Sequence, residues 1–336
     1  MNDATTPRGS IALTGGSGFV GGHILRRLVA EGWQVRALTR RPDSLPGIEG
    51  VAPGTVTPIP GDLGSAEALA ELVAGVDAVI HCAGLVAARR KADFLRVNAE
   101  GTAALLRAVT ARKRAGGDAP CFVLMSSLAA REPQLSPYAH SKRQAEEELR
   151  RIGADLDWRI LRPAVVYGPG DRATLPLFRQ FLRGLALVPG GGGRFSMIYV
   201  EDLAAAAVAA LAPELPSGGI LEPDDGTAGG YGWPELLAAA ARLAGRPVRA
   251  IAVPPALQRL AAALGTAGAL VSGRPAVLSQ GKVNEIGHPD WVCRPRPPEA
   301  LPGSPSLSDC ISWRPAVGLD EGFSKTVAWY KAAGWL

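Results

Sequence analysis

The chain has 336 residues, of which 47% are hydrophobic and 20% charged, with a formal net charge of +5 and a pI near 9.2. This composition is typical of a folded globular protein of one large or two smaller domains and excludes an intrinsically disordered chain. No block of like charges occurs, so we expect no binding to nucleic acid. No apolar run approaches the roughly 20 residues of a membrane-spanning helix.

The first ten residues lack the pattern of a secretory signal peptide. Four cysteines, at positions 82, 121, 293 and 310, are scattered along the chain, which favours a reducing cytoplasm over a disulfide framework. His288, Cys293 and Cys310 match no usual zinc spacing, so we expect no metal site.

Short apolar runs alternate with amphipathic stretches through the first half. We expect strands over 10–14, 33–39, 56–63, 77–84, 121–127 and 158–168, and helices over 19–32, 66–76, 98–114 and 138–153. This alternation predicts an α/β fold, a Rossmann-like doubly wound parallel sheet with helices on both faces. Ligands of such sheets bind beyond the carboxyl ends of the strands.

After Pro169 glycine and proline become dense and the expected helices are rich in alanine. We expect residues 289–309 to form an extended surface loop and 319–336 to be helical again. Residues 1–168 are therefore predicted to be mainly a dinucleotide-binding domain, and 169–336 mainly a smaller, interleaved substrate-binding domain. The stretch 254–273 carries Leu257, Leu260, Leu264 and Leu270. It is typical of a core helix, but it also fits the lining of an apolar channel or a helix on a bilayer surface.

Three glycines, Gly15, Gly18 and Gly21, lie between the first expected strand and the first expected helix. At a strand–turn–helix junction this spacing is typical of dinucleotide binding, because the glycines permit a tight turn and a close approach of the backbone to a pyrophosphate. The helix N-terminus adds free N–H groups and the positive end of the helix dipole. An ordinary turn is the alternative.

The second expected strand ends in Thr39, Arg40 and Arg41. Enzymes that prefer NAD usually carry Asp or Glu at this place, to bind the ribose 2′-hydroxyl. A guanidinium instead matches a 2′-phosphate, so the sequence favours NADP(H), with Arg40 as the contact. NAD(H) stays an alternative, as does a solvated basic turn with no ligand.

Tyr138 and Lys142 are four residues apart in an expected helix and therefore share one face. An ammonium near the phenol would lower the pKa of Tyr138 from about 10 and make it a usable proton donor or acceptor. Ser126 and Ser127 end the preceding strand, where a hydroxyl can bind a substrate oxygen. A Tyr–Lys pair also occurs by chance on surface helices, but here it follows a nucleotide-type loop.

Together these motifs resemble the extended short-chain dehydrogenase/reductases, the NAD-dependent epimerase/dehydratase superfamily. The resemblance covers nearly the whole chain and includes "GDL", "HCAG", "VNAEGT", "LRPAVVYGPG" and "IYVEDLAAA". It implies catalysis by Tyr138, assisted by Ser127 and Lys142, and makes His81 a packing residue at a strand end. The cofactor-binding residues that it implies, together with those proposed above, are Gly15, Ser17, Gly18, Phe19, Val20, Gly21, Arg40, Asp62, Leu63, Ala83, Gly84, Asn98, Tyr138, Lys142, Pro163 and Val166.

Two departures weaken the reading as a sugar-nucleotide enzyme. The diphosphate-binding arginine of that group falls on Phe195, with Arg194 one residue out of register, and the segment 127–138 is short. The chain looks closer to hydroxysteroid-dehydrogenase-like and dihydroflavonol-reductase-like members. We therefore expect an NAD(P)H-dependent ketoreductase for a hydrophobic, lipid-like carbonyl compound such as a 3-oxo sphingoid base or ceramide.

The alternatives are an NDP-sugar epimerase or dehydratase and, third, a non-catalytic NAD(P)-binding subunit. A homodimer and a peripheral contact with a membrane stay open.

Overall fold

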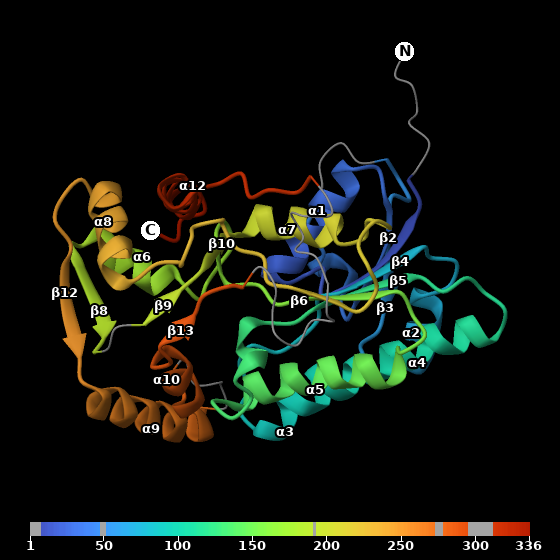
Figure 1. The fold of residues 1–336 in the computed structure, drawn as a ribbon, viewed down its shortest axis with the longest axis horizontal. Coiled ribbons are helices and arrows are strands. Elements are labelled where there is room, and N and C mark those ends of the chain that lie inside the picture. Colours follow the sequence, from blue (N-terminus) through green and yellow to red (C-terminus); the bar gives the residue numbers. More distant parts are fainter. Residues whose placement is uncertain (1–7, 48–51, 191–192, 273–277, 295–311) are drawn as a thin grey trace, which may run out of the picture.

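The centre of the molecule is a seven-stranded, all-parallel sheet in the order β11-β6-β5-β4-β1-β2-β3 (Figure 1). The computed structural model describes residues 8–47, 52–190, 193–272, 278–294 and 312–336, with backbone alone over 266–272. The strands of the sheet are β1 (Ser10–Thr14), β2 (Gln34–Thr39), β3 (Val56–Pro60), β4 (Ala78–His81), β5 (Cys121–Met125), β6 (Trp158–Leu161) and β11 (Gly219–Leu221). The strand order reverses between β1 and β4, and this reversal makes the ligand crevice of a doubly wound sheet. The predicted fold class is confirmed.

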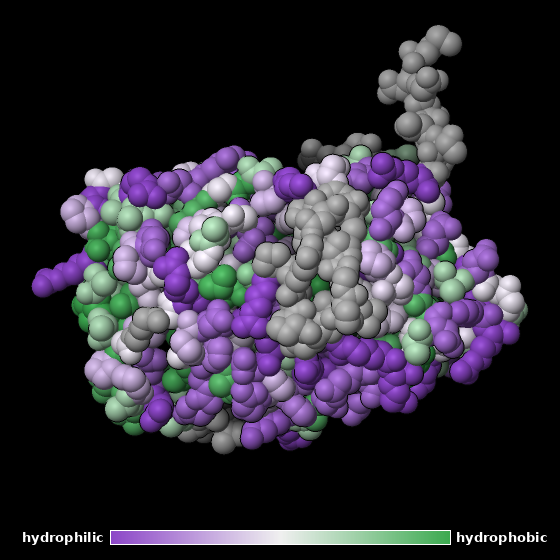
Figure 2. Space-filling view, in the orientation of Figure 1, coloured by the Kyte–Doolittle hydropathy of each residue, from purple (hydrophilic) through white to green (hydrophobic). Residues whose placement is uncertain are grey.

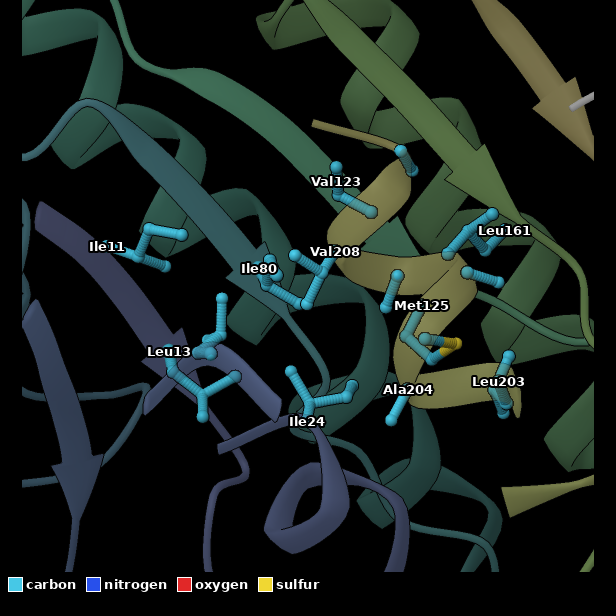
Figure 3. Packing of buried hydrophobic residues seen from close by; sticks show 14 of the residues in the cluster. Ile11, Leu13, Ile24, Ile80, Val123, Met125, Leu161, Leu203, Ala204 and Val208 are labelled. Carbon is cyan, nitrogen blue, oxygen red and sulfur yellow. The ribbon is translucent and has the colours of Figure 1, made fainter. Parts of the chain in front are cut away.

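Helices cover both faces of this sheet. Helices α1 (Phe19–Ala30) and α7 (Val200–Ala209) pack on one face, where Ile24, Leu203 and Val208 meet Leu13 and Ile80 of the strands (Figure 3). The other face is covered by α2 (Ala66–Leu72), α4 (Gly101–Arg114) and α5 (Pro137–Ile152). Both faces of the inner strands are buried, which explains their continuous apolar runs, whereas the edge strand β3 is largely exposed. Between β4 and α4 the chain forms α3 (Lys91–Phe94) and a π-helical turn, η2 (Leu95–Glu100); short 3₁₀ turns are η1 (Pro42–Ser44) and η3 (Leu128–Arg131).

Beyond residue 161 the chain builds a second region beside the sheet, while α7 and β11 return to the sheet itself (Figure 1). Its strands form three two-stranded parallel sheets: β7 (Val165–Tyr167) with β10 (Met197–Tyr199), β8 (Leu185–Pro189) with β12 (Arg249–Val253), and β9 (Arg194–Phe195) with β13 (Asp290–Trp291). Its helices are α6 (Leu175–Leu182), α8 (Trp233–Ala244), α9 (Pro255–Ser272), α10 (Gln280–Ile286) and α12 (Leu319–Ala332). An aromatic core that includes Tyr167, Phe178 and Phe323 holds α6, α8 and α12 together.

Most predicted elements of the first half are present, several of them ending a few residues earlier than expected, and two differ more clearly. Residues 158–168 were expected to form one strand with a turn, but the strand ends at Leu161 and a separate strand, β7, starts at Val165 in another sheet. Pro163 lacks the N–H that a ladder needs and so ends the pairing. The helix expected to start at Asn98 is α4, which starts at Gly101 and is preceded by a π-helical turn.

The extended loop expected over 289–309 lies mostly outside the described residues, as does Cys310, while Asp290 and Trp291 form β13. Across the described ranges, no helix is both long and apolar enough to cross a membrane.

Candidate functional site

The glycine turn forms the floor of a site at the carboxyl edge of the sheet. Gly15 has φ +79° and lies so near the segment after β4 that a Cβ there would be 2.7 Å from the backbone nitrogen of Ala83. A Cβ on Gly21 would lie 2.0 Å from the carbonyl oxygen of Gly15, so only glycine lets α1 start this close to β1. Ser17 and Gly18 face solvent at the helix start, while Phe19 and Val20 are half-buried.

The start of α1 can receive an anion. Gly18 provides no side-chain cap, and no acidic residue lies in the first turn of the helix. Its first N–H groups are therefore available to an anionic partner, as helix N-termini are in phosphate sites. These features fit the pyrophosphate of a dinucleotide.

Three further predicted cofactor residues, Arg40, Asp62 and Leu63, follow β2 and β3 at the same edge. Arg40 follows β2 and is exposed, while the Thr39 hydroxyl donates to the carbonyl oxygen of Arg41 at 2.8 Å and shapes the turn. Asp62, after β3, is also exposed, and its Oδ1 accepts from the N–H of Gly64 at 2.8 Å. The neighbouring Leu63 is half-buried against Gly101. Both charged side chains therefore face solvent beside the crevice, at positions where a nucleotide could reach them.

Tyr138, Ser127 and Lys142 come together beside this crevice. Ser136 caps α5 by accepting from the N–H of Ala139 at 2.9 Å, and Pro137 occupies the first helical position, so Tyr138 lies in the first turn. Its hydroxyl lies near enough to the Ser127 side chain, which follows β5, for the serine to lower its pKa as a hydrogen-bond partner. Lys142 lies one turn further along α5, and its Nζ donates to the carbonyl oxygen of Met125 at 2.8 Å.

The pKa of Tyr138 differs from the sequence expectation. The surrounding protein desolvates the hydroxyl and raises its pKa to about 12, although the hydrogen bond from Ser127 acts in the opposite direction. We expected Lys142 to lower it, and that prediction is wrong for the protein without cofactor, because burial outweighs the other influences. Burial also lowers the pKa of Lys142. The phenol is thus a firmly protonated group, suited to donate a proton.

Asn98 ties the segment after β4 to helix α5. Its Oδ1 accepts from the N–H of Leu85 at 2.7 Å, and its Nδ2 donates to the Leu85 carbonyl oxygen at 3.0 Å and to Ser141 Oγ at 2.8 Å. Gly84 lies next to this contact, since a Cβ there would be 3.1 Å from Asn98 Oδ1 and 3.3 Å from Lys142 Nζ. The side-chain amide of Asn98 is thus used in hydrogen bonds within the protein, and it fixes the backbone at Leu85.

The adjacent serines separate into two environments because successive strand residues face opposite sides. Ser127 is half-buried at Tyr138, whereas Ser126 is buried and donates to Glu146 Oε1 at 2.6 Å. Arg162 clamps the same carboxylate through Nε and Nη2, at 2.8 and 2.7 Å. Sequence reasoning missed this buried pair. The spacing in the sequence could have indicated Glu146, because it lies one turn beyond Lys142 on the helix face that carries Tyr138.

His81 is a structural residue, as predicted. It is buried, with Nδ1 2.6 Å from Thr14 Oγ1 and Nε2 2.9 Å from Thr102 Oγ1. Desolvation lowers its pKa to about 3, so it stays neutral at physiological pH. It joins the ends of β4 and β1 to α4.

The other predicted contacts lie further along the chain. Pro163 is buried and its carbonyl oxygen accepts from the N–H of Leu128, while Val166 is half-buried. Arg194 donates to the carbonyl oxygens of Gly229 and Gly230, both at 2.7 Å, which engages the side chain within the protein.

Comparison with known proteins identifies the family. The model of the NAD-dependent epimerase/dehydratase family matches residues 11–221, from β1 to the end of β11. The chain belongs to this family. It is 41% identical to a ceramide reductase of Caulobacter vibrioides over 334 residues, which are 99% of this chain and 98% of the relative.

A farnesyl-quinoline-oxide ketoreductase of Stigmatella aurantiaca is 31% identical over 54% of this chain and 58% of that one. A 3β-hydroxysteroid dehydrogenase/isomerase of Mycobacterium tuberculosis is 28% identical over 65% of each chain. Among solved structures, MoeE5 in complex with UDP-glucose and NAD superposes with a TM-score of 0.70 at 23% identity, over 97% of this chain and 99% of that one. The last likeness shows the fold of an extended short-chain dehydrogenase/reductase. With relatives named reductase and dehydrogenase, the chain is an enzyme, an NAD(P)-dependent oxidoreductase of this family.

Proposed function

We propose that the protein reduces the carbonyl group of a lipid-like substrate, such as a 3-oxo sphingoid base or its N-acylated, ceramide-type form, with NADP(H) preferred. The observation that carries the proposal is the meeting of Ser127, Tyr138 and Lys142 beside the glycine turn. The likeness to a ceramide reductase over almost the full length of both chains supports the substrate class.

The bound nicotinamide would supply the hydride. The protonated Tyr138 hydroxyl would then donate a proton to the carbonyl oxygen, while the Ser127 hydroxyl donates a hydrogen bond to the same oxygen. Lys142, held on the Met125 carbonyl with two further N–H donors, would bind ribose hydroxyls and favour the phenolate that remains. Residues 169–336 would provide most contacts to the rest of the substrate.

The preference for NADP(H) rests on Arg40. Its exposed guanidinium follows β2, where a 2′-phosphate would lie in a doubly wound fold. Arg40→Ala should raise the Kd of NADPH about tenfold or more, because a charge-assisted contact is lost, and leave NADH nearly unchanged. Equal effects on both nucleotides would contradict the preference.

The reaction is tested with variants of Tyr138 and Ser127, and the neighbouring Ser126 provides the control for Ser127. Tyr138→Phe and Ser127→Ala should retain NADPH binding, with Tyr138→Phe losing kcat by about a hundredfold or more. Ser126→Ala should instead lower the melting temperature, because Ser126 binds Glu146. The assay follows NADPH oxidation with 3-oxo sphingoid bases and N-acylated 3-oxo lipids. Full activity of Tyr138→Phe would remove the phenol from the mechanism.

An NDP-sugar epimerase is the second candidate, because most of the chain matches solved sugar-nucleotide enzymes in fold. UDP-glucose should then raise the melting temperature of the protein. Arg194 already donates hydrogen bonds to the carbonyl oxygens of Gly229 and Gly230, which argues against its binding the diphosphate of a sugar nucleotide. Stabilisation by UDP-glucose together with no reduction of any 3-oxo lipid would reverse the ranking.

A further inference from the structure

Helix α9 presents leucines to solvent. Leu257, Leu260 and Leu264 are 56, 56 and 65% exposed and recur at the spacing of one helical face. The side of α9 turned to the protein carries Ala262, which is fully buried. A helix that buries alanine and exposes leucine has the reverse of the pattern that a water-soluble surface helix shows. Of the three readings of this stretch in the sequence, the core helix is therefore wrong for Leu257, Leu260 and Leu264.

The exposed apolar surface continues onto the strand pair that precedes α9. Leu187 of β8 and Ile251 of β12 are direct partners across the pair and are 50 and 46% exposed. Only Pro254 separates β12 from α9, and Figure 1 shows β12 running down to α9 at the lower left margin of the molecule. Figure 2 shows hydrophobic residues along this margin. We define the α9 face as Leu187, Ile251, Leu257, Leu260 and Leu264.

The charged residues next to this face along the chain are basic, although Arg242 is paired with Asp320, Lys282 is paired with Glu285, and Arg274 lies outside the described residues. Residues 236–284 contain six Lys or Arg residues and no Asp or Glu. Arg249 is exposed on β12, two residues before Ile251 and so on the same side of that strand, and Arg259 is exposed on α9, about 100° round the helix from Leu260. Leucines flanked by arginines match a bilayer with anionic headgroups, into which the leucines insert while the guanidinium groups stay at the phosphates. A second copy of the chain matches less well, because a self-paired face would bring arginines against arginines.

The α9 face is also one helix away from the catalytic tyrosine. Helix α10 follows α9 and contacts the segment that starts α5: Asn284 donates to the Leu135 carbonyl oxygen at 3.1 Å, and Glu285 accepts from the hydroxyl of Ser136, the α5 cap. A Cβ on Gly281 would lie 2.7 Å from the Ser136 side chain, so α10 fits closely against this turn. Tyr138 lies two residues beyond the cap.

We propose that the α9 face docks the protein on the surface of a bilayer that contains anionic phospholipid. Docking there places the catalytic end of α5 near the membrane, from which a lipid substrate would be taken. This purpose rests on the proposed function, whereas the docking itself rests on the exposed leucines and the arginines alone.

The test is flotation of the full-length protein with vesicles of phosphatidylcholine, with and without phosphatidylglycerol. We expect binding to the anionic vesicles, weakened by added salt, and weaker binding to phosphatidylcholine alone. Leu260→Glu combined with Leu264→Glu should weaken binding at least tenfold. The control Leu336→Glu changes an exposed apolar residue at the C-terminus, which Figure 1 shows above α9, beside α6 and α12, and should bind like the wild type.

A second pair of variants tests the charges. Arg249→Gln with Arg259→Gln should weaken binding about tenfold at low salt, and Arg107→Gln with Arg114→Gln, on exposed positions of α4, should not. Cofactor binding and thermal unfolding of each variant report whether its fold is intact.

Three results would overturn the proposal: a wild type that stays off anionic vesicles, a leucine variant that binds like the wild type, or a dimer in solution that this variant dissolves. The last would assign the face to a second copy. If the wild type floats but reduces no 3-oxo lipid, docking stands and the proposed function fails.

Discussion

The buried ion pair between Glu146 and Arg162 offers the sharpest test of how the site is held in place. Both side chains are fully buried, and two hydrogen bonds of 2.8 and 2.7 Å join them. Glu146 also accepts from Ser126 at 2.6 Å. Changing Glu146 to Gln keeps the shape but removes the charge that the Arg162 guanidinium faces.

Loss of one partner of a buried pair costs about 3–5 kcal/mol. Glu222 lies 3.8 Å from Arg162 and compensates in part, so we expect the lower end, about 3 kcal/mol. At about 2 cal/mol/K of unfolding entropy per residue, a chain of this length should lose roughly 4 °C of melting temperature. Calorimetry or far-UV circular dichroism measures this shift directly.

The control is Glu147→Gln, the same substitution one residue along α5, where the pair with Arg143 is partly exposed at 3.5 Å. Its melting temperature should stay within about 1 °C of the wild type. Combining Glu146→Gln with Arg162→Met removes both charges and should cost less than the sum of the two single changes. Equal melting temperatures for the Glu146 and Glu147 variants, or strict additivity in the double variant, would refute the reasoning.

Three further predictions concern single residues. Gly21→Ala should abolish NADPH binding, measured by fluorescence titration, because the new Cβ meets the Gly15 carbonyl, whereas Gly22→Ala should bind normally, since its Cβ would lie 3.5 Å from the nearest atom. His81 has a folded pKa of about 3 against 6.5, so the unfolded state takes up its proton first as the pH falls. The stability that this residue provides is complete above about pH 6.5 and is lost below it by about 1.4 kcal/mol per pH unit, and denaturant melts should show a shallower acid dependence for His81→Gln. Tyrosinate absorbance should show no difference between the wild type and Tyr138→Phe below pH 10 without cofactor, because the Tyr138 pKa is raised to about 12; an ionisation near pH 8 that the variant lacks would contradict this.

The sequence predicts the sheet well because its strands are buried on both faces and its helices carry regular apolar stripes. It also identifies the residues that meet at the site, since Ser127 ends a strand, while Tyr138 and Lys142 share a helix face. The sequence alone does not predict the pKa of a single group, because burial and neighbouring charges both contribute to it. The spacing of Tyr138 and Lys142 suggested a lowered phenol pKa, whereas burial, which depends on the whole fold, raises it.

Contacts between residues far apart in the chain are the second feature that the sequence does not predict. The contact of Glu285 with Ser136 joins residues 149 positions apart, and nothing local in either segment indicates it. The leucines of α9 illustrate the same limit, because a periodic apolar stripe looks alike whether it is covered or left open. Only the exposure of Leu257, Leu260 and Leu264 separates these cases.

The order of the strands has a consequence for how the protein is made. The strand β11, at residues 219–221, forms one edge of the sheet. The helix α7, at residues 200–209, covers the part of the sheet face beside α1. A nascent chain that has left the ribosome only as far as residue 168 would carry β6 with one edge unpaired and an uncovered apolar layer. At about 5–20 residues per second, translation leaves this state exposed for several seconds. Holding by a chaperone over that interval should therefore matter more for this chain than for one whose nucleotide-binding half is completed before the next begins.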